Sequence, residues 1–178
     1  MNSNKVMNMA ADNIRILAAS MVEKAKSGHP GGAMGGADFI NVLYSEYLQY
    51  DPENPKWEGR DRFFLDPGHM APMLYSQLAL AGKFTLEELA QLRQWESPTP
   101  GHPEVDIMRG IENTSGPLGQ GHVFAVGAAI AAKFLADAQA TLLLQRRPYM
   151  HTFLTVVFRR RSHRVQAVSQ VTSVSTTS

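Results

Sequence analysis

The sequence predicts an α/β fold that is largely helical. Several segments repeat apolar residues at helical spacing, with Gly- and Pro-rich turns between them. One short apolar run bounded by charged residues, Arg62–Leu65, is predicted to be a buried strand. A strand flanked by helices is typical of layered α/β proteins. The length of 178 residues, with 44% hydrophobic and 19% charged residues, fits one globular domain.

The predicted helices each carry an apolar stripe with gaps of three or four residues. They cover residues 10–26, 37–47, 70–81, 86–94 and 119–135. The first helix must stop at the Gly- and Pro-rich segment Ser27–Gly32. Thr85, with Glu88 three residues later, is predicted to cap the 86–94 helix. A long loop over 97–116 precedes the last helix.

The charges divide the chain into two regions. Residues 1–137 hold all 16 acidic residues and 11 of the 17 basic ones, a net charge of −5. Residues 138–178 hold six Arg and no acidic residue, a net charge of +6. This change predicts a boundary near Asp137.

The composition also excludes some classes of protein. Without Cys, the chain has no disulfides, zinc-thiolate site or cysteine nucleophile. An apolar leader and a run of about 18 apolar residues, the length of a membrane span, are both absent, so we expect a cytoplasmic protein. We expect no metal site, since no His pair has helical ligand spacing and the carboxylates are scattered.

Four histidines directly follow a glycine. They are His29, His69, His102 and His122, the first three in predicted loops. Glycine lets the backbone approach a ligand closely, and imidazole can donate, accept or transfer a proton near neutral pH. The alternative is that each is an ordinary loop residue hydrogen-bonded to nearby backbone.

The segment Thr114–Gly121 combines three Gly and a Pro just before a predicted helix. Its bare amides at a helix N-terminus suit a diphosphate. It lacks the Lys-Ser/Thr pair of a P-loop and is not GxGxxG. An ordinary turn that begins a helix remains the alternative.

Four motifs follow one another over about residues 10–135: Ser27–Gly32, Asp61–Leu65 with Gly68–His69, Pro100–Glu104 and Thr114–Gly121. Together, in this order, they resemble the N-terminal part of the transketolase family. The resemblance implies an incomplete thiamine-diphosphate-binding α/β fold, with thiamine diphosphate and Mg²⁺ as cofactors. It also implies transfer of a two-carbon ketol unit from a ketose phosphate to an aldose phosphate, by an intact enzyme that is a homodimer. The cofactor then carries the difficult chemistry, and the protein orients and polarises.

The resemblance assigns roles position by position. His29 and His102 resemble the catalytic histidines that contact sugar oxygens and assist proton movement. His69 resembles the histidine beside the cofactor diphosphate. Gly116, Pro117 and Leu118 resemble the loop that lines the cofactor. His122 matches no functional position, and we expect a packed or solvated helix residue.

Residues 138–178 depart from the family pattern. The family continues with a strand and an Asp-Gly motif that holds Mg²⁺, whereas this region has neither Asp nor Gly, so the Mg²⁺ ligands are absent. Taken at face value, residues 158–164 are a basic patch for nucleic acid or a membrane, followed by a floppy Ser/Thr/Val-rich tail. We favour a third explanation, in which the region is translated in the wrong frame.

The genetic code supports the frame hypothesis. A shifted codon joins one wobble base to two fixed bases, which permits few amino acids at each step. From Tyr149 to Phe158 the permitted residues include YAYISDGGIQ, and from Arg159 onward EEISQGAGRIAGHLGLDN. Both stretches resemble the next transketolase segment, with Asp-Gly across the codons of residues 154–156. The frame would change between Leu135 and about Arg146.

The frame hypothesis predicts a truncated chain without ketol transfer of its own. It lacks the Mg²⁺ carboxylate and the glutamate that, in the family, a later domain of the neighbouring subunit supplies. We expect sugar-phosphate substrates for the intact enzyme, and neither nucleic acid nor membrane as a partner. The alternatives are one subunit of a split enzyme, deoxyxylulose-phosphate synthase, or a binding module that contacts nucleic acid through Arg159, Arg160, Arg161 and Arg164.

Overall fold

The computed structural model describes residues 3–142, 153–161 and 164–172, with side chains described over 3–135. Its helical elements are α1 (Asn4–Ala25), α2 (Pro30–Gly35), α3 (Ala37–Val42), the π-helical turn η1 (Leu43–Tyr47), the 3₁₀ turn η2 (Gly68–Met70), α4 (Ala71–Leu80), α5 (Leu86–Leu89), the 3₁₀ turn η3 (Ile107–Arg109) and α6 (Gln120–Leu142). The strands are β1 (Arg62–Asp66), β2 (Phe153–Arg161) and β3 (Arg164–Thr172).

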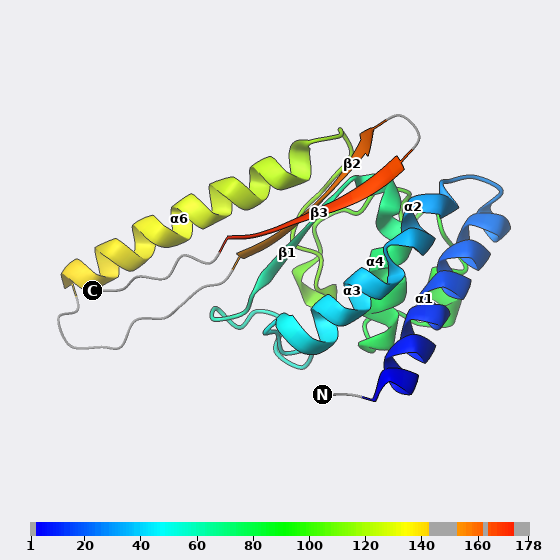
Figure 1. Cartoon of the computed structure of the whole chain (residues 1–178), viewed down its shortest axis with the longest axis horizontal. Helices are drawn as coiled ribbons and strands as arrows, with labels where there is room; N and C mark the ends of the chain where they lie inside the picture. Colours follow the sequence, from blue (N-terminus) through cyan, green and yellow to red (C-terminus); the bar gives the residue numbers. More distant parts are fainter. Residues whose placement is uncertain (1–2, 143–152, 162–163, 173–178) are drawn as a thin grey trace.

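The sheet lies between two layers of helices (Figure 1). Helices α1 to α4 pack on one another on one side, and α6 packs on β1 and β2 from the other side. The strand order is β1-β2-β3, with β1 and β2 parallel and β2 and β3 antiparallel. This arrangement confirms the predicted α/β class.

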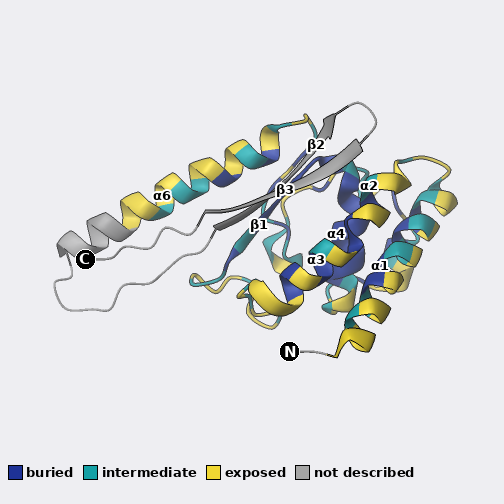
Figure 2. Ribbon diagram, in the orientation of Figure 1, coloured by how far each residue is buried: buried dark blue, intermediate teal, exposed yellow. Residues whose placement is uncertain are grey.

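Strand β1 divides the core because successive side chains point to opposite faces. Phe63 and Leu65 join the large cluster formed with the α1–α4 layer. Phe64 packs on the other face, against Ala125 of α6. Figure 2 shows the buried residues concentrated along β1 and α4, whereas much of α6 is exposed.

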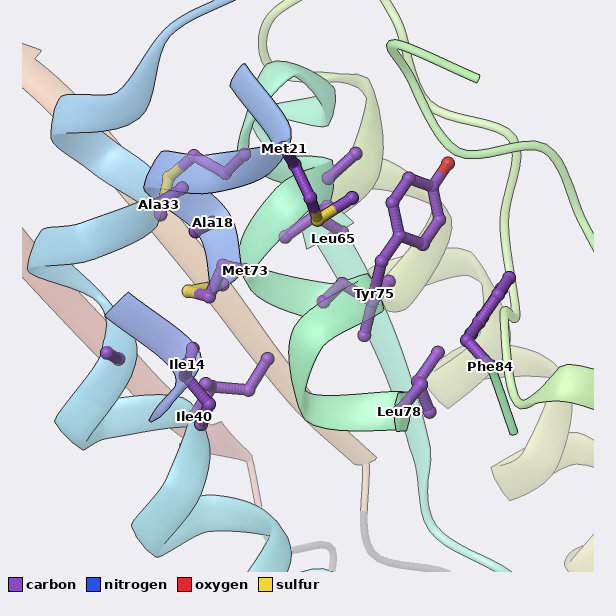
Figure 3. Close-up of a cluster of buried hydrophobic side chains, with 14 of the residues drawn as sticks. Ile14, Ala18, Met21, Ala33, Ile40, Leu65, Met73, Tyr75, Leu78 and Phe84 are labelled. Atoms are coloured by element: carbon purple, nitrogen blue, oxygen red, sulfur yellow. The ribbon is translucent and has the colours of Figure 1, made fainter. Parts of the chain in front are cut away.

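The larger core is built around α4. Its residues from Ala71 to Leu78 are all buried, because α1 to α3 cover one side of the helix and β1 lies nearby. Figure 3 shows Ile14 and Met21 of α1 meeting Met73 and Tyr75 of α4 in this cluster. A helix that is apolar on all sides is typical of such a central position.

The segment that precedes α6 runs beside β1 and is fastened to it. Nδ2 of Asn113 donates to the carbonyl of Leu65 at 3.4 Å, and its Oδ1 accepts the Leu65 amide at 3.1 Å. Glu112 accepts two hydrogen bonds from the Arg60 guanidinium, at 2.7 and 3.1 Å. Both side chains of this ion pair are largely buried.

Several element bounds differ from the predictions. The first helix begins earlier than expected, at Asn4, because the Ser3 hydroxyl caps it. The helix α2 was missed: Pro30 ends the preceding segment but suits the first turn of a new helix. Helix α5 ends at Leu89 rather than 94, and α6 extends to Leu142 rather than 135.

Two strands of the region 138–178 belong to the sheet. One interpretation of the sequence was a flexible tail at the end of this region. Strand β2 pairs with β1 from Arg62↔Phe153 to Asp66↔Val157, and β3 returns beside it. Its Val, Thr and Phe residues favour strands. The side chains of the basic patch at 158–164 lie outside the described residues. So does the part of the predicted frame change beyond residue 142.

Candidate cofactor and substrate site

His29 and His69 lie side by side although 40 positions separate them in the sequence. Helix α1 ends at Ala25, its C-cap residue Lys26 is in the left-handed conformation, and Gly28, with φ of +132°, leads to His29. His29 is the N-cap residue of α2, and His69 lies in the turn η2. The two rings meet edge to face, with centroids 5.0 Å apart and an angle of 66° between their planes.

The turn that carries His69 also touches the Gly-rich loop before α6. A Cβ built on Gly68 would lie 2.6 Å from the carbonyl oxygen of Ser115. That position therefore requires glycine. Because Gly68 has no side chain, His69, which follows β1 closely in the chain, can lie directly beside the loop.

Hydrogen bonds also join the loop of His102 to the Gly-rich loop before α6. The Ser115 amide donates to the carbonyl of Pro103 at 3.0 Å, and the Val105 amide donates to Oγ1 of Thr114 at 3.0 Å. His102 itself is exposed. These hydrogen bonds place the backbone next to His102 beside the loop, while the rings of His29 and His69 are in contact with each other.

The start of the His102 loop is held by a buried phenol. Oη of Tyr75 donates to the carbonyl of Pro100 at 2.9 Å. Burial raises the pKa of Tyr75 above the ordinary value, with a smaller contribution from Glu104. The phenol therefore keeps its proton and remains a donor.

Arg93 connects the loops that carry His29 and His102. Its Nη1 donates to Oγ of Ser27 at 2.8 Å. On the other side, a Cβ built on Gly101 would lie 2.6 Å from Nε of Arg93. The sequence analysis missed Arg93, and no local signal marks a contact between residues 66 positions apart.

The turn Gly116–Leu118 is open to solvent. A Cβ built on Gly116 would have no neighbour within 4 Å, and Leu118 is 74% exposed. Gly119 follows with φ of +91°, and α6 begins at the next residue. The turn thus presents free surface at the N-terminus of a long helix, where backbone amides favour an anion.

Asp66 at the end of β1 holds the start of α6. Its Oδ1 accepts the Gly119 amide at 3.2 Å, and its Oδ2 lies 3.4 Å from Nδ1 of His122. The sequence analysis gave neither residue a function. The available signal was an acidic residue at the carboxyl end of the predicted strand, next to the Pro-Gly turn.

A hollow of about 800 Å³ borders the His102 loop and is lined mainly by Tyr75, Arg93, Trp95, Pro100 and Glu104. None of His29, His69 and His102 lines it. Over the described side chains, no group of three His, Cys, Asp or Glu residues could hold a metal ion. No helix in the described ranges is long and apolar enough to cross a membrane.

Known proteins are similar to this chain in sequence and in fold. The family described as "Transketolase, thiamine diphosphate binding domain" matches residues 6–147. Transketolase 1 of Escherichia coli is 53% identical over 127 residues, which are 71% of this chain and 19% of that protein.

Two solved structures extend the comparison. Transketolase from Leishmania mexicana has a TM-score of 0.75 and 41% identity, covering 87% of this chain and 22% of that one. Transketolase from Pichia stipitis in complex with sedoheptulose 7-phosphate has a TM-score of 0.72 and 36% identity, covering 86% and 22%. The chain thus spans about a fifth of the length of the relatives it matches. It belongs to the transketolase family, in the part described as the thiamine diphosphate binding domain.

Proposed function

We propose that the intact protein is a transketolase that moves a two-carbon ketol unit between sugar phosphates. One observation carries the proposal: His29, His69 and the Ser115 loop meet at the carboxyl end of β1. Parallel α/β sheets bind their ligands at this edge. The solved Pichia relative in complex with sedoheptulose 7-phosphate supports the substrate class.

The residues at this edge fit thiamine diphosphate. Gly116 leaves open space where a side chain would stand, and Ser115 Oγ is a buried hydroxyl for which the described residues provide no hydrogen-bond partner. We assign the diphosphate to His69 and the turn Gly116–Leu118, with the N-terminus of α6 favouring its negative charge. Bound there, the cofactor would supply the carbon nucleophile for the donor ketone.

The substrate roles belong to His29 and His102 in this proposal. Imidazole can donate to or accept from a sugar hydroxyl and can carry a proton near neutral pH. Arg93 supports the assignment because it contacts both loops that carry these histidines. Mg²⁺ and a homodimer complete the proposal for the intact enzyme, whose metal ligands would follow residue 137 in the restored frame.

The chain of 178 residues is expected to show negligible ketol transfer. It spans about a fifth of its relatives, and residues 138–178 contain no Asp-Gly motif. The assay mixes the purified chain with xylulose 5-phosphate, ribose 5-phosphate, thiamine diphosphate and Mg²⁺. Full-length Escherichia coli transketolase is the positive control. Robust formation of sedoheptulose 7-phosphate by the chain would overturn this expectation.

Sequencing the DNA around codons 130–150 tests the frame hypothesis, and an uninterrupted frame that encodes residues 138–178 as written would end it. The protein from the restored frame then tests the function. We expect it to form sedoheptulose 7-phosphate, and His29→Ala or His102→Ala to lower kcat/KM by about 10²- to 10⁴-fold, the usual range for loss of a proton-transfer group. His69→Ala should mainly raise the thiamine diphosphate concentration needed for half-maximal activity. Normal kinetics in all three variants would contradict the assignment.

A binding module for nucleic acid remains the second candidate. The register of β2 and β3 places Arg159 to Arg161 opposite residues 164–166, so the Arg positions gather at one end of the strand pair. This candidate predicts binding to a DNA duplex that weakens steeply between 50 and 200 mM salt, as phosphate contacts do. The frame hypothesis predicts no such binding.

A further inference from the structure

We propose that Asp66 is a positioning residue that, together with His122, fixes the turn Gly116–Leu118 on the end of β1. The inference rests on the proposed function, because it gives that turn the cofactor. It adds two residues that the family motifs quoted above do not assign.

The carboxylate of Asp66 is buried and its two oxygens serve different partners. Its side chain is only 4% exposed, whereas that of His122 is 42% exposed. Oδ1 accepts the Gly119 amide and Oδ2 faces Nδ1 of His122. A buried carboxylate requires such partners, since burial without them is costly. The contacts therefore hold Asp66 and its two partners together.

Both partners lie within four residues after the turn. Gly119 is the residue after Leu118, and His122 lies in the first turn of α6. A single side chain at the end of β1 thus holds the downstream end of the turn. At the upstream end, the Ser115 amide is held by Pro103. The turn is supported at both ends and open between them.

The backbone at the start of α6 is packed against the strand just as closely. A Cβ built on Gly121 would lie 2.4 Å from the Leu65 carbonyl oxygen and 2.6 Å from Cβ of Asp66. A Cβ built on Gly119 would lie 3.5 Å from Cε1 of His122, so the imidazole covers Gly119. Asp66 also places negative charge at the positive end of the α6 dipole, which stabilises this arrangement.

Hydrogen exchange of individual backbone amides in the 178-residue chain tests the proposal. Asp66→Ala should speed exchange of the Gly119 amide by about tenfold or more, since a hydrogen bond to a charged acceptor is lost. Asp66→Asn keeps an acceptor oxygen and should restore most of the protection. The Leu65 amide, bonded to Asn113, is the internal control for a global loss of stability.

The exchange result decides the structural half of the proposal. Unchanged exchange at Gly119 in Asp66→Ala, or an equal increase at Leu65, would overturn it. If Asp66→Ala does not fold, His122→Ala replaces it: the Gly119 amide should then exchange faster, and Leu65 should not. The same two contrary outcomes apply to that variant.

Thiamine diphosphate binding by the same variants of the restored-frame protein, measured by calorimetry with Mg²⁺, tests the functional half. Asp66→Ala should weaken binding by about tenfold and Asp66→Asn less, because the turn loses a charge-assisted hydrogen bond. Faster exchange at Gly119 with unchanged affinity would overturn the positioning role. If the unsubstituted restored-frame protein binds no thiamine diphosphate, the cofactor assignment fails, and with it the positioning role, while the exchange data still report the contact.

Discussion

At Gly68 the absence of one methyl group allows two loops to meet. The carbonyl of Ser115 occupies the space that a Cβ would take, and it belongs to rigid backbone. The neighbouring His69, in η2, is in ring contact with His29. Because Gly68 has no side chain, the His69 turn and the Ser115 loop can approach this closely.

Gly68→Ala is expected to destabilise the protein by about 1–3 kcal/mol, the usual cost of forcing an extra carbon into a packed site. Urea unfolding measures this loss of free energy. Gly35→Ala is the matched control, because a Cβ there meets nothing within 4 Å and alanine favours the helix α2. Equal stability of the two variants would contradict the steric argument.

At the scale of elements, α5 begins with a complete capping box. The Thr85 hydroxyl accepts the Glu88 amide at 3.2 Å, and the Glu88 carboxylate accepts the Thr85 amide at 2.9 Å. Glu88 also pairs with Arg109 at 2.8 Å, so the cap connects α5 to the turn η3. A helix of one turn depends on its cap more than a long helix does.

Thr85→Ala should lower the free energy of unfolding by about 1 kcal/mol, the typical value of a lost N-cap. Thr85→Ser keeps the hydroxyl and should cost much less. Chemical denaturation of both variants gives the comparison. Identical losses would show that the methyl group of Thr85, and not its hydroxyl, stabilises this end of α5.

The capping box and β1 show which elements a sequence can predict. Thr85 and Glu88 are close in the chain and carry the start signal themselves, and the apolar run of β1 is equally local. The end of α5 is not local: the Arg93 amide bonds Thr99, and the Arg93 side chain reaches Ser27. Tertiary contacts therefore shortened a helix that periodicity had extended to residue 94.

At the scale of the whole molecule, the site also depends on distant pairs. His29 and His69 could be predicted because they lie in motifs. The contact between their rings, and the polar contact between Asp66 and His122, arise only from packing. Neither spacing nor composition encodes that a strand end and a helix start will meet. The sequence could therefore predict which residues belong to the site, but not the contacts that hold them together.

The outward side of α6 is a continuous apolar surface. Val123, Val126, Ile130 and Phe134 recur along it at helical spacing, and each is more than half exposed. Surfaces of this kind in isolated chains promote association. We therefore expect the chain to associate through α6 and to be poorly soluble.

Replacing Ile130 and Phe134 together by Glu should shift the chain toward monomer and reduce binding of an apolar dye. Light scattering after size-exclusion chromatography measures the mass. Ile16→Glu, at a similarly exposed position on α1, is the control and should change neither quantity. A similar shift in the control would show that added charge alone, and not the α6 surface, governs association.

The side chain of Asn113 imitates a neighbouring strand. By offering both an acceptor and a donor to Leu65, it occupies hydrogen-bonding groups on the outer border of the sheet, where another extended chain would otherwise add. One carboxamide thereby hinders the addition of another strand at Leu65.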